Sequence, residues 1–151
     1  HRWLLVGRAG IAAFRAWLAA RAGKLKPFWL PSFQSDLAVV APVGGTDAFL
    51  TLENRGYAEG PVAAVGRRDL LITTTSGTRF YRRITAASEI DAASEMVAID
   101  SALGSTLQPH QFRRISFMHL VRLDTDNVEI AHVTDEVAEV VLPLRSLRDD
   151  L

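Results

Sequence analysis

Histidine is the side chain of this sequence best suited to metal binding or acid–base chemistry, and the chain has four of them. His119 and His132 fall on two predicted strands that follow each other in the chain, so they could lie close together. Asp124, Asp126 and Glu129 are the nearest carboxylates that could complete a metal site. Zinc sites need three or four protein ligands, and neither HxH nor HExxH spacing is present. A small metal-dependent hydrolase using His119 or His132 is therefore one alternative, and ordinary sheet histidines are the simpler interpretation.

Two other stretches contain residue types that hold ions, but in the wrong spacing. Asp124–Asn127 resembles the start of a calcium loop, yet the sixth and twelfth positions hold Glu129 and Asp135 instead of Gly and Glu. Gly7–Gly10 precedes a predicted helix but lacks the P-loop and dinucleotide patterns. A turn and a helix start explain these two stretches. The sequence therefore predicts no catalytic, cofactor-binding or metal site.

Three arginine pairs are the remaining charged feature: Arg67–Arg68, Arg82–Arg83 and Arg113–Arg114. Each pair is flanked by acidic or apolar residues, and the whole chain has a formal net charge of zero. A nucleic-acid binder would show a clustered positive charge instead. Solvated strand edges or salt bridges between subunits are the better interpretation, and edge arginines also discourage unwanted strand pairing.

Composition limits the functional classes further. The chain has 151 residues, 48% hydrophobic and 23% charged, as in one ordinary globular domain. We expect residues 1–151 to form a single domain of a longer chain, because the sequence starts with His in a strand-like run. The chain has no net charge, so we expect no nucleic-acid partner. It has no cysteine, which excludes disulfide and thiol chemistry. It also has no long apolar run, so we expect no membrane insertion.

One amphipathic helix is predicted near the N-terminus, over residues 8–22. Ile11, Phe14, Trp17 and Leu18 fall on one face at helical spacing, and alanine fills much of the remainder. Gly23 follows where a left-handed C-cap is expected. This helix is preceded by a short predicted strand over residues 3–6.

An aromatic segment follows the helix, and its two prolines, Pro27 and Pro31, force extended backbone. Phe28, Trp29 and Phe33 present large rigid apolar surfaces on this segment. They either pack back onto the helix or are buried by another subunit. Packing within the chain is the simpler interpretation, because aromatic side chains usually complete a core.

The remainder of the sequence predicts short strands and turns. Strands are expected over residues 36–41, 48–53, 69–75, 79–90 and 95–99, and a three-stranded meander over 114–123, 128–133 and 136–144. The alanines in residues 86–98 could also support a helix. The predicted fold class is α+β, mostly antiparallel β, sandwich or barrel-like, with a C-terminal meander and one principal N-terminal helix.

The helix and aromatic segment resemble tail proteins of long-tailed bacteriophages. The resemblance covers residues 14–37, FRAWLAARAGKLKPFWLPSFQSDL, and the closing residues 114–147 are similar to the last meander of the same proteins. The matching positions in the first stretch are Phe14, Trp17, Gly23, Pro27, Phe28, Trp29, Leu30, Pro31, Ser32, Asp36 and Leu37.

This resemblance implies a structural protein of the tail tip, of the distal-tail or baseplate type, and not an enzyme. Such proteins form rings, often hexameric, that join the tail tube to the hub, so the implied partners are copies of the chain and other tail proteins. The implied location is the virion, after assembly in the host cytoplasm. Trp17, Phe28, Trp29 and Phe33 are the expected interface residues. A carbohydrate-binding β-module that stacks Trp29 or Tyr57 on a sugar is the second alternative.

Overall fold

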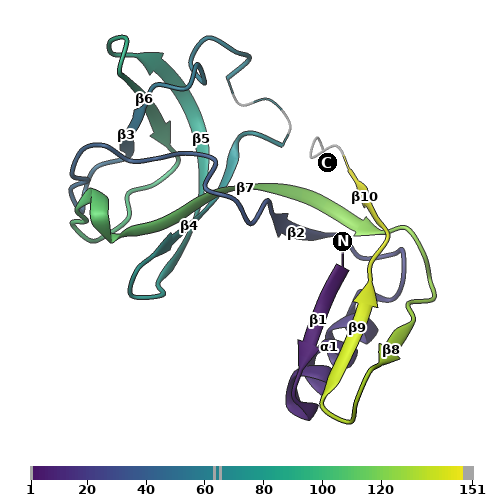
Figure 1. Ribbon diagram of the computed structural model, residues 1–151. Coiled ribbons are helices and arrows are strands. Elements are labelled where there is room, and N and C mark those ends of the chain that lie inside the picture. Colours follow the sequence, from purple (N-terminus) through teal and green to yellow (C-terminus); the bar gives the residue numbers. More distant parts are fainter. Residues whose placement is uncertain (1, 63, 65, 148–151) are drawn as a thin grey trace. The chain divides into compact units, whose positions relative to one another are not determined.

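The computed structural model describes residues 2–62, 64 and 66–147 and divides the chain into two compact units. The first unit contains residues 1–29 and 120–151, and the second contains residues 30–119. The chain passes between them within strand β2 (Phe28–Pro31) and strand β7 (Phe112–Leu123). Both units are built mainly from antiparallel strands (Figure 1).

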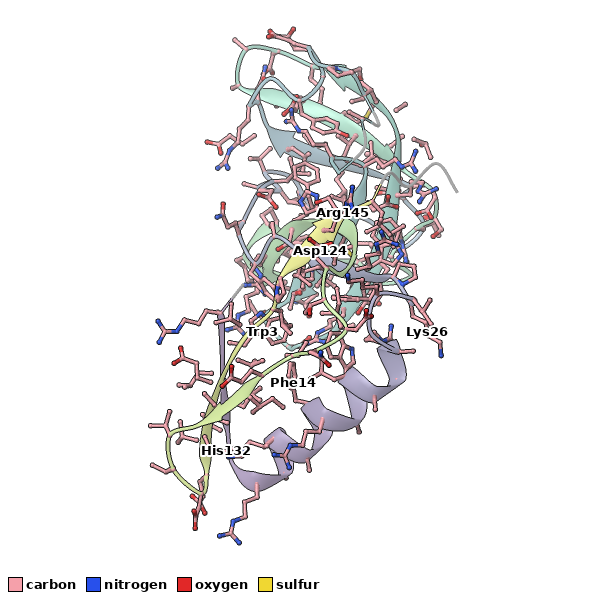
Figure 2. All side chains as sticks on the ribbon, turned by 90° about the vertical axis from the view of Figure 1, so that its right-hand side faces the viewer. Trp3, Phe14, Lys26, Asp124, His132 and Arg145 are labelled. Atoms are coloured by element: carbon pink, nitrogen blue, oxygen red, sulfur yellow. The ribbon has the colours of Figure 1, made fainter. Side chains whose placement is uncertain are left out.

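The first unit is a helix packed on a small antiparallel sheet in the order β1-β9-β8. Its elements are α1 (Arg8–Arg21), β1 (Arg2–Val6), β8 (Ile130–His132), β9 (Val137–Val141) and β10 (Leu144–Ser146). Trp3 and Phe14 meet between sheet and helix, with ring centroids 6.1 Å apart (Figure 2). Leu123, Val140 and Leu142 complete this core. The remaining strand, β10, pairs with the last three residues of β7.

The two ends of α1 follow from local chemistry. Gly7 is the N-cap, with a φ of 79°, and its N–H donates to the Glu136 carbonyl at 2.7 Å. At the C-terminal end both Ala22 and Gly23 adopt left-handed backbone. The next N–H, of Lys24, donates to the Asp126 carboxylate at 3.1 Å. A side chain at residue 23 would collide with that carboxylate, which belongs to the loop after β7. Position 23 therefore requires glycine.

The second unit is an antiparallel sheet in the order β7-β4-β5-β6-β3. The strands not yet bounded are β3 (Phe49–Glu53), β4 (Asp69–Thr74), β5 (Arg79–Glu89) and β6 (Ser94–Ile99). One face of this sheet carries the core, which includes Leu50, Leu52, Ile72, Ile84 and Ile115. A single 3₁₀ turn, η1 (Pro109–Gln111), leads into β7.

The predicted fold class is confirmed: the chain is mostly antiparallel β with one α-helix near the N-terminus. Within the described residues neither sheet closes into a barrel. The strands expected over residues 48–53, 69–75, 79–90 and 95–99 form, each within two residues of the predicted bounds. The alanines of β5 and β6 are therefore strand residues.

Two predictions are wrong. Residues 36–41 form no regular strand, because only Leu37 and Val39 make isolated bridges, to Ile115 and Leu52. The C-terminal meander is also broken, since β7 pairs with β4 and β10 while β8 pairs only with β9. Of the predicted meander, only the β8–β9 hairpin forms.

Candidate interaction surfaces

Two of the four expected interface residues belong to the core of the first unit. Trp17 stacks on Phe14, with ring centroids 5.5 Å apart, and meets the Phe28 ring edge-on at 4.9 Å. The Arg21 guanidinium lies over the Trp17 ring at 5.7 Å. Trp17 and Phe28 therefore dock the helix and the aromatic segment within the chain, as the simpler interpretation predicts.

The other two expected interface residues remain accessible after folding. Trp29, in the first unit, is 39% exposed, and Phe33, in the second, is 46% exposed. Whether either contacts a partner stays a prediction. Of the two, Phe33 has the more unusual backbone, with a φ of 61°. A bulky residue rarely adopts this left-handed conformation unless its surroundings impose it.

The surroundings of Phe33 hold its segment firmly against β7. The Ser32 N–H donates to the Phe117 carbonyl at 2.8 Å, and the Asp36 N–H donates to the Ile115 carbonyl at 2.9 Å. The Asp36 carboxylate accepts hydrogen bonds from the Phe117 N–H at 2.8 Å and the Ser32 hydroxyl at 2.5 Å. The backbone on both sides of Phe33 is therefore fixed against β7.

Arg114 shares the exposed environment of Phe33. Its Nη1 donates to the Phe33 carbonyl at 3.0 Å, and its guanidinium lies over the Phe33 ring at 5.9 Å. In the sheet, Arg114 is opposite Thr73, and Thr73 is opposite Arg79. Cross-strand partners share a face, so Arg114 and Arg79 lie on the face opposite the core.

Tyr81 completes this surface, because it lies two residues from Arg79 on β5 and therefore points to the same side. Its side chain is 58% exposed. We call the four residues of this surface the arginine–aromatic face. They are Phe33, Arg79, Tyr81 and Arg114. Next to them, Arg83 pairs with Asp69 at 2.8 Å, and the same carboxylate also lies 3.4 Å from the Arg68 guanidinium.

The tip of the β5–β6 hairpin carries negatively charged side chains, in contrast to the arginine–aromatic face. Ile90 is 52% exposed there and lies between Glu89 and Asp91. The Asp91 carboxylate accepts hydrogen bonds from the Ala93 N–H at 2.8 Å, the Ser94 N–H at 2.7 Å and the Ser94 hydroxyl at 2.9 Å. We call Glu89, Ile90 and Asp91 the acidic tip. Its turn is ordered by Asp91 itself.

This turn should be sensitive to acid. The hydrogen bonds from the Ala93 N–H, the Ser94 hydroxyl and the Ser94 N–H lower the pKa of Asp91 below its ordinary value of 3.8. A carboxyl with a lowered pKa stabilises the folded state above its unfolded pKa, and this contribution is lost as the pH falls through the folded pKa. We therefore expect the turn to loosen only below pH 3.8. Carboxyl chemical shifts and amide exchange at Ala93 and Ser94 measure this.

Asp91→Asn is the matched control, since its amide oxygen can still accept a hydrogen bond but does not titrate in this range. The protection of the turn amides against exchange, relative to their intrinsic rates, should then no longer decrease in acid. A carboxyl of Asp91 that titrates at or above pH 3.8 would contradict the expectation.

The histidines considered for metal binding lie in different units. His119, in the second unit, lies against Gly66, while His132, in the first, lies 3.0 Å from an Arg15 guanidinium nitrogen. Since a guanidinium only donates hydrogen bonds, the His132 Nε2 must be the acceptor. His132 also lines a hollow of about 450 Å³ together with Arg8, Ile11, Arg15 and Asp135. No group of three potential metal ligands occurs among the described residues.

Tyr57 is unsuitable for sugar stacking, which removes part of the carbohydrate-binding alternative. Its side chain is only 3% exposed, and its hydroxyl donates to the Arg67 carbonyl at 2.6 Å. Its ring stacks on Phe117 with centroids 6.0 Å apart. Only Trp29 of that alternative remains on the surface.

One residue that sequence reasoning missed is Glu95, which is fully buried on β6. Its carboxylate accepts the Arg55 N–H at 3.1 Å and the Ala58 N–H at 2.8 Å. Glu95 thereby anchors the loop after β3. The sequence did contain a signal for this burial. Glu95 is spaced by two and four residues from the apolar Val97 and Ile99, so all three point to the same buried face of the strand.

No protein-family model and no characterised protein matches this chain in sequence. Within the described part of the chain, no helix combines the length and the hydropathy needed to cross a bilayer.

Proposed function

We propose that this protein is a structural component of a bacteriophage tail tip, where copies of it form a ring that links the tail tube to the tip complex. The proposal rests first on the sequence resemblance of residues 14–37 and 114–147 to tail proteins. It makes the chain a scaffold whose partners are other copies of itself and neighbouring tail proteins. Its function would then depend on exposed contact surfaces.

The observation that carries the proposal is that part of the aromatic segment stays exposed after the chain has folded. Phe28 is used within the chain, but Phe33 stays 46% exposed on backbone that is strained and firmly hydrogen-bonded to β7. Rigid exposed aromatic side chains are typical anchors of protein interfaces, because little side-chain entropy is lost when they are buried. An assembly protein needs such anchors.

Immunogold electron microscopy tests this function directly. Antibodies raised against the purified protein should label one end of the tail in virions produced by the strain that encodes the chain. Labelling of the end distal to the head is the expected result. Virions that carry no label, or label only on the capsid, would overturn the proposal, and preimmune serum is the control.

A further inference from the structure

We infer that the arginine–aromatic face of one copy binds the acidic tip of the next copy, in a head-to-tail contact. This inference rests on the proposed function, because it names the surfaces through which a ring would form. Both surfaces lie within the second unit. The occupant of each surface is therefore the other surface of an identical chain.

The arginine–aromatic face offers two uncompensated positive charges around apolar rings. Arg114 is held over the Phe33 ring by its bond to the Phe33 carbonyl, and Arg79 lies two strands away on the same face. With strands spaced about 4.8 Å apart, the two arginines are separated by about 10 Å. Tyr81 lies beside Arg79 on this face. The result is an exposed aromatic surface flanked by cations.

The acidic tip is complementary to this face in its charge and in its exposed apolar surface. It presents one exposed apolar side chain, Ile90, between two carboxylates, Glu89 and Asp91. Among the described residues, no ion pair involves any of the four charged groups, which are Arg79, Arg114, Glu89 and Asp91. Within that part of the chain, two positive and two negative charges therefore have no ion-pair partner.

The two surfaces cannot satisfy each other within one molecule. Tyr81 and Ile90 are nine positions apart along β5 and its end, which corresponds to about 30 Å at 3.3 Å per residue. Figure 1 shows the β4–β5 and β5–β6 hairpins at opposite ends of β5. Each half of β5 is held by a different neighbour, β4 over residues 79–83 and β6 over residues 84–89, and among the described residues the two surfaces form no ion pair with each other. Their partners must come from other copies.

Different patches at the two ends of one unit define a heterologous contact. Such contacts repeat in one direction and close into a ring when the rotation between copies permits it. Opposite charges at the two ends also favour this orientation over head-to-head or tail-to-tail contact, which would bring like charges together. The geometry thus supplies a direction for assembly.

Charge reversal with rescue tests the contact. Arg79→Glu leaves the arginine–aromatic face with one cation and one carboxylate, and Glu89→Arg does the same to the acidic tip. Either change removes the net charge of one surface, so each variant should associate with itself at least tenfold more weakly than the unaltered protein. Mixing the two variants should restore association, and so should combining both changes in one chain. Sedimentation velocity over a concentration series measures this, with circular dichroism to verify folding. Lys26→Glu, an exposed change of the same charge in the first unit, is the control and should associate normally.

Three results would overturn the inference: an unaltered protein that stays monomeric, single variants that associate normally, or weakened variants that mixing does not restore. Failure here is separable from failure of the proposed function. Tail labelling with no effect of charge reversal would reject only this contact. Rescue by mixing with no tail labelling would support the contact and reject the tail-tip function.

Discussion

Replacing Glu95 with alanine is expected to lower the free energy of unfolding of the second unit by about 3–5 kcal/mol. The carboxylate is fully buried and accepts two backbone N–H groups, from Arg55 and Ala58. Removal leaves two part-buried donors without this acceptor, at about 1–3 kcal/mol each, and also leaves a cavity. Because native domains are stable by only about 5–15 kcal/mol, this loss is large. Urea unfolding followed by circular dichroism measures it.

Two controls sharpen this prediction. Glu95→Gln keeps one acceptor oxygen but turns an amide NH₂ toward the other backbone N–H, so we expect a smaller but clear loss. Glu89 is the cross-strand partner of Glu95 and is exposed, so Glu89→Ala should change the free energy of unfolding by less than about 0.5 kcal/mol. Equal losses for Glu89→Ala and Glu95→Ala would show that burial of the Glu95 carboxylate does not matter.

The second large effect is expected for Trp17→Ala, at about 3 kcal/mol of lost stability in the first unit. The change removes the ring that packs against Phe14 and Phe28 and lies under Arg21. The helix would then lose its main contact with the aromatic segment. The chain's three tryptophans, at positions 3, 17 and 29, all lie in the first unit, so tryptophan fluorescence during urea unfolding reports on that unit.

Trp29→Ala is the matched control, since the same residue type lies 39% exposed in the same unit. We expect it to cost less than Trp17→Ala, because more of the removed surface is already in water. Losses of the same size for both variants would contradict the assignment of Trp17 to the core and Trp29 to the surface.

Local patterns in the sequence predicted the elements well. The spacing of Ile11, Phe14 and Trp17 predicted α1, and Ile11 and Phe14 are indeed buried. Turn residues predicted the β5–β6 and β8–β9 hairpins, because the two strands of a hairpin are neighbours in the chain. These features depend on interactions over a few residues, which a single sequence displays directly.

Pairing between distant segments could not be read in the same way. Sequence order suggested that β7 and β8 are neighbours, whereas β7 pairs with β4 and β10, and β9 pairs with β1 from the other end of the chain. The sequence predicted residues 124–127 as a turn between paired strands, but in the structure the Asp126 carboxylate caps the end of the helix by accepting the Lys24 N–H. Strand order depends on which apolar faces are buried together, and that is a property of the whole fold.

The sequence by itself determined the helix, most strands, the antiparallel β class and the neutral charge balance. Only the tertiary structure decided which aromatic residues are available for contact. Phe28 and Phe33 belong to one short segment, but Phe28 meets a helix and Phe33 meets solvent and Arg114. It also placed Arg79 and Arg114, which are distant in the sequence, on one face of the sheet with one strand between them. Composition gives no such information, because burial and proximity arise from pairing between residues far apart in the chain.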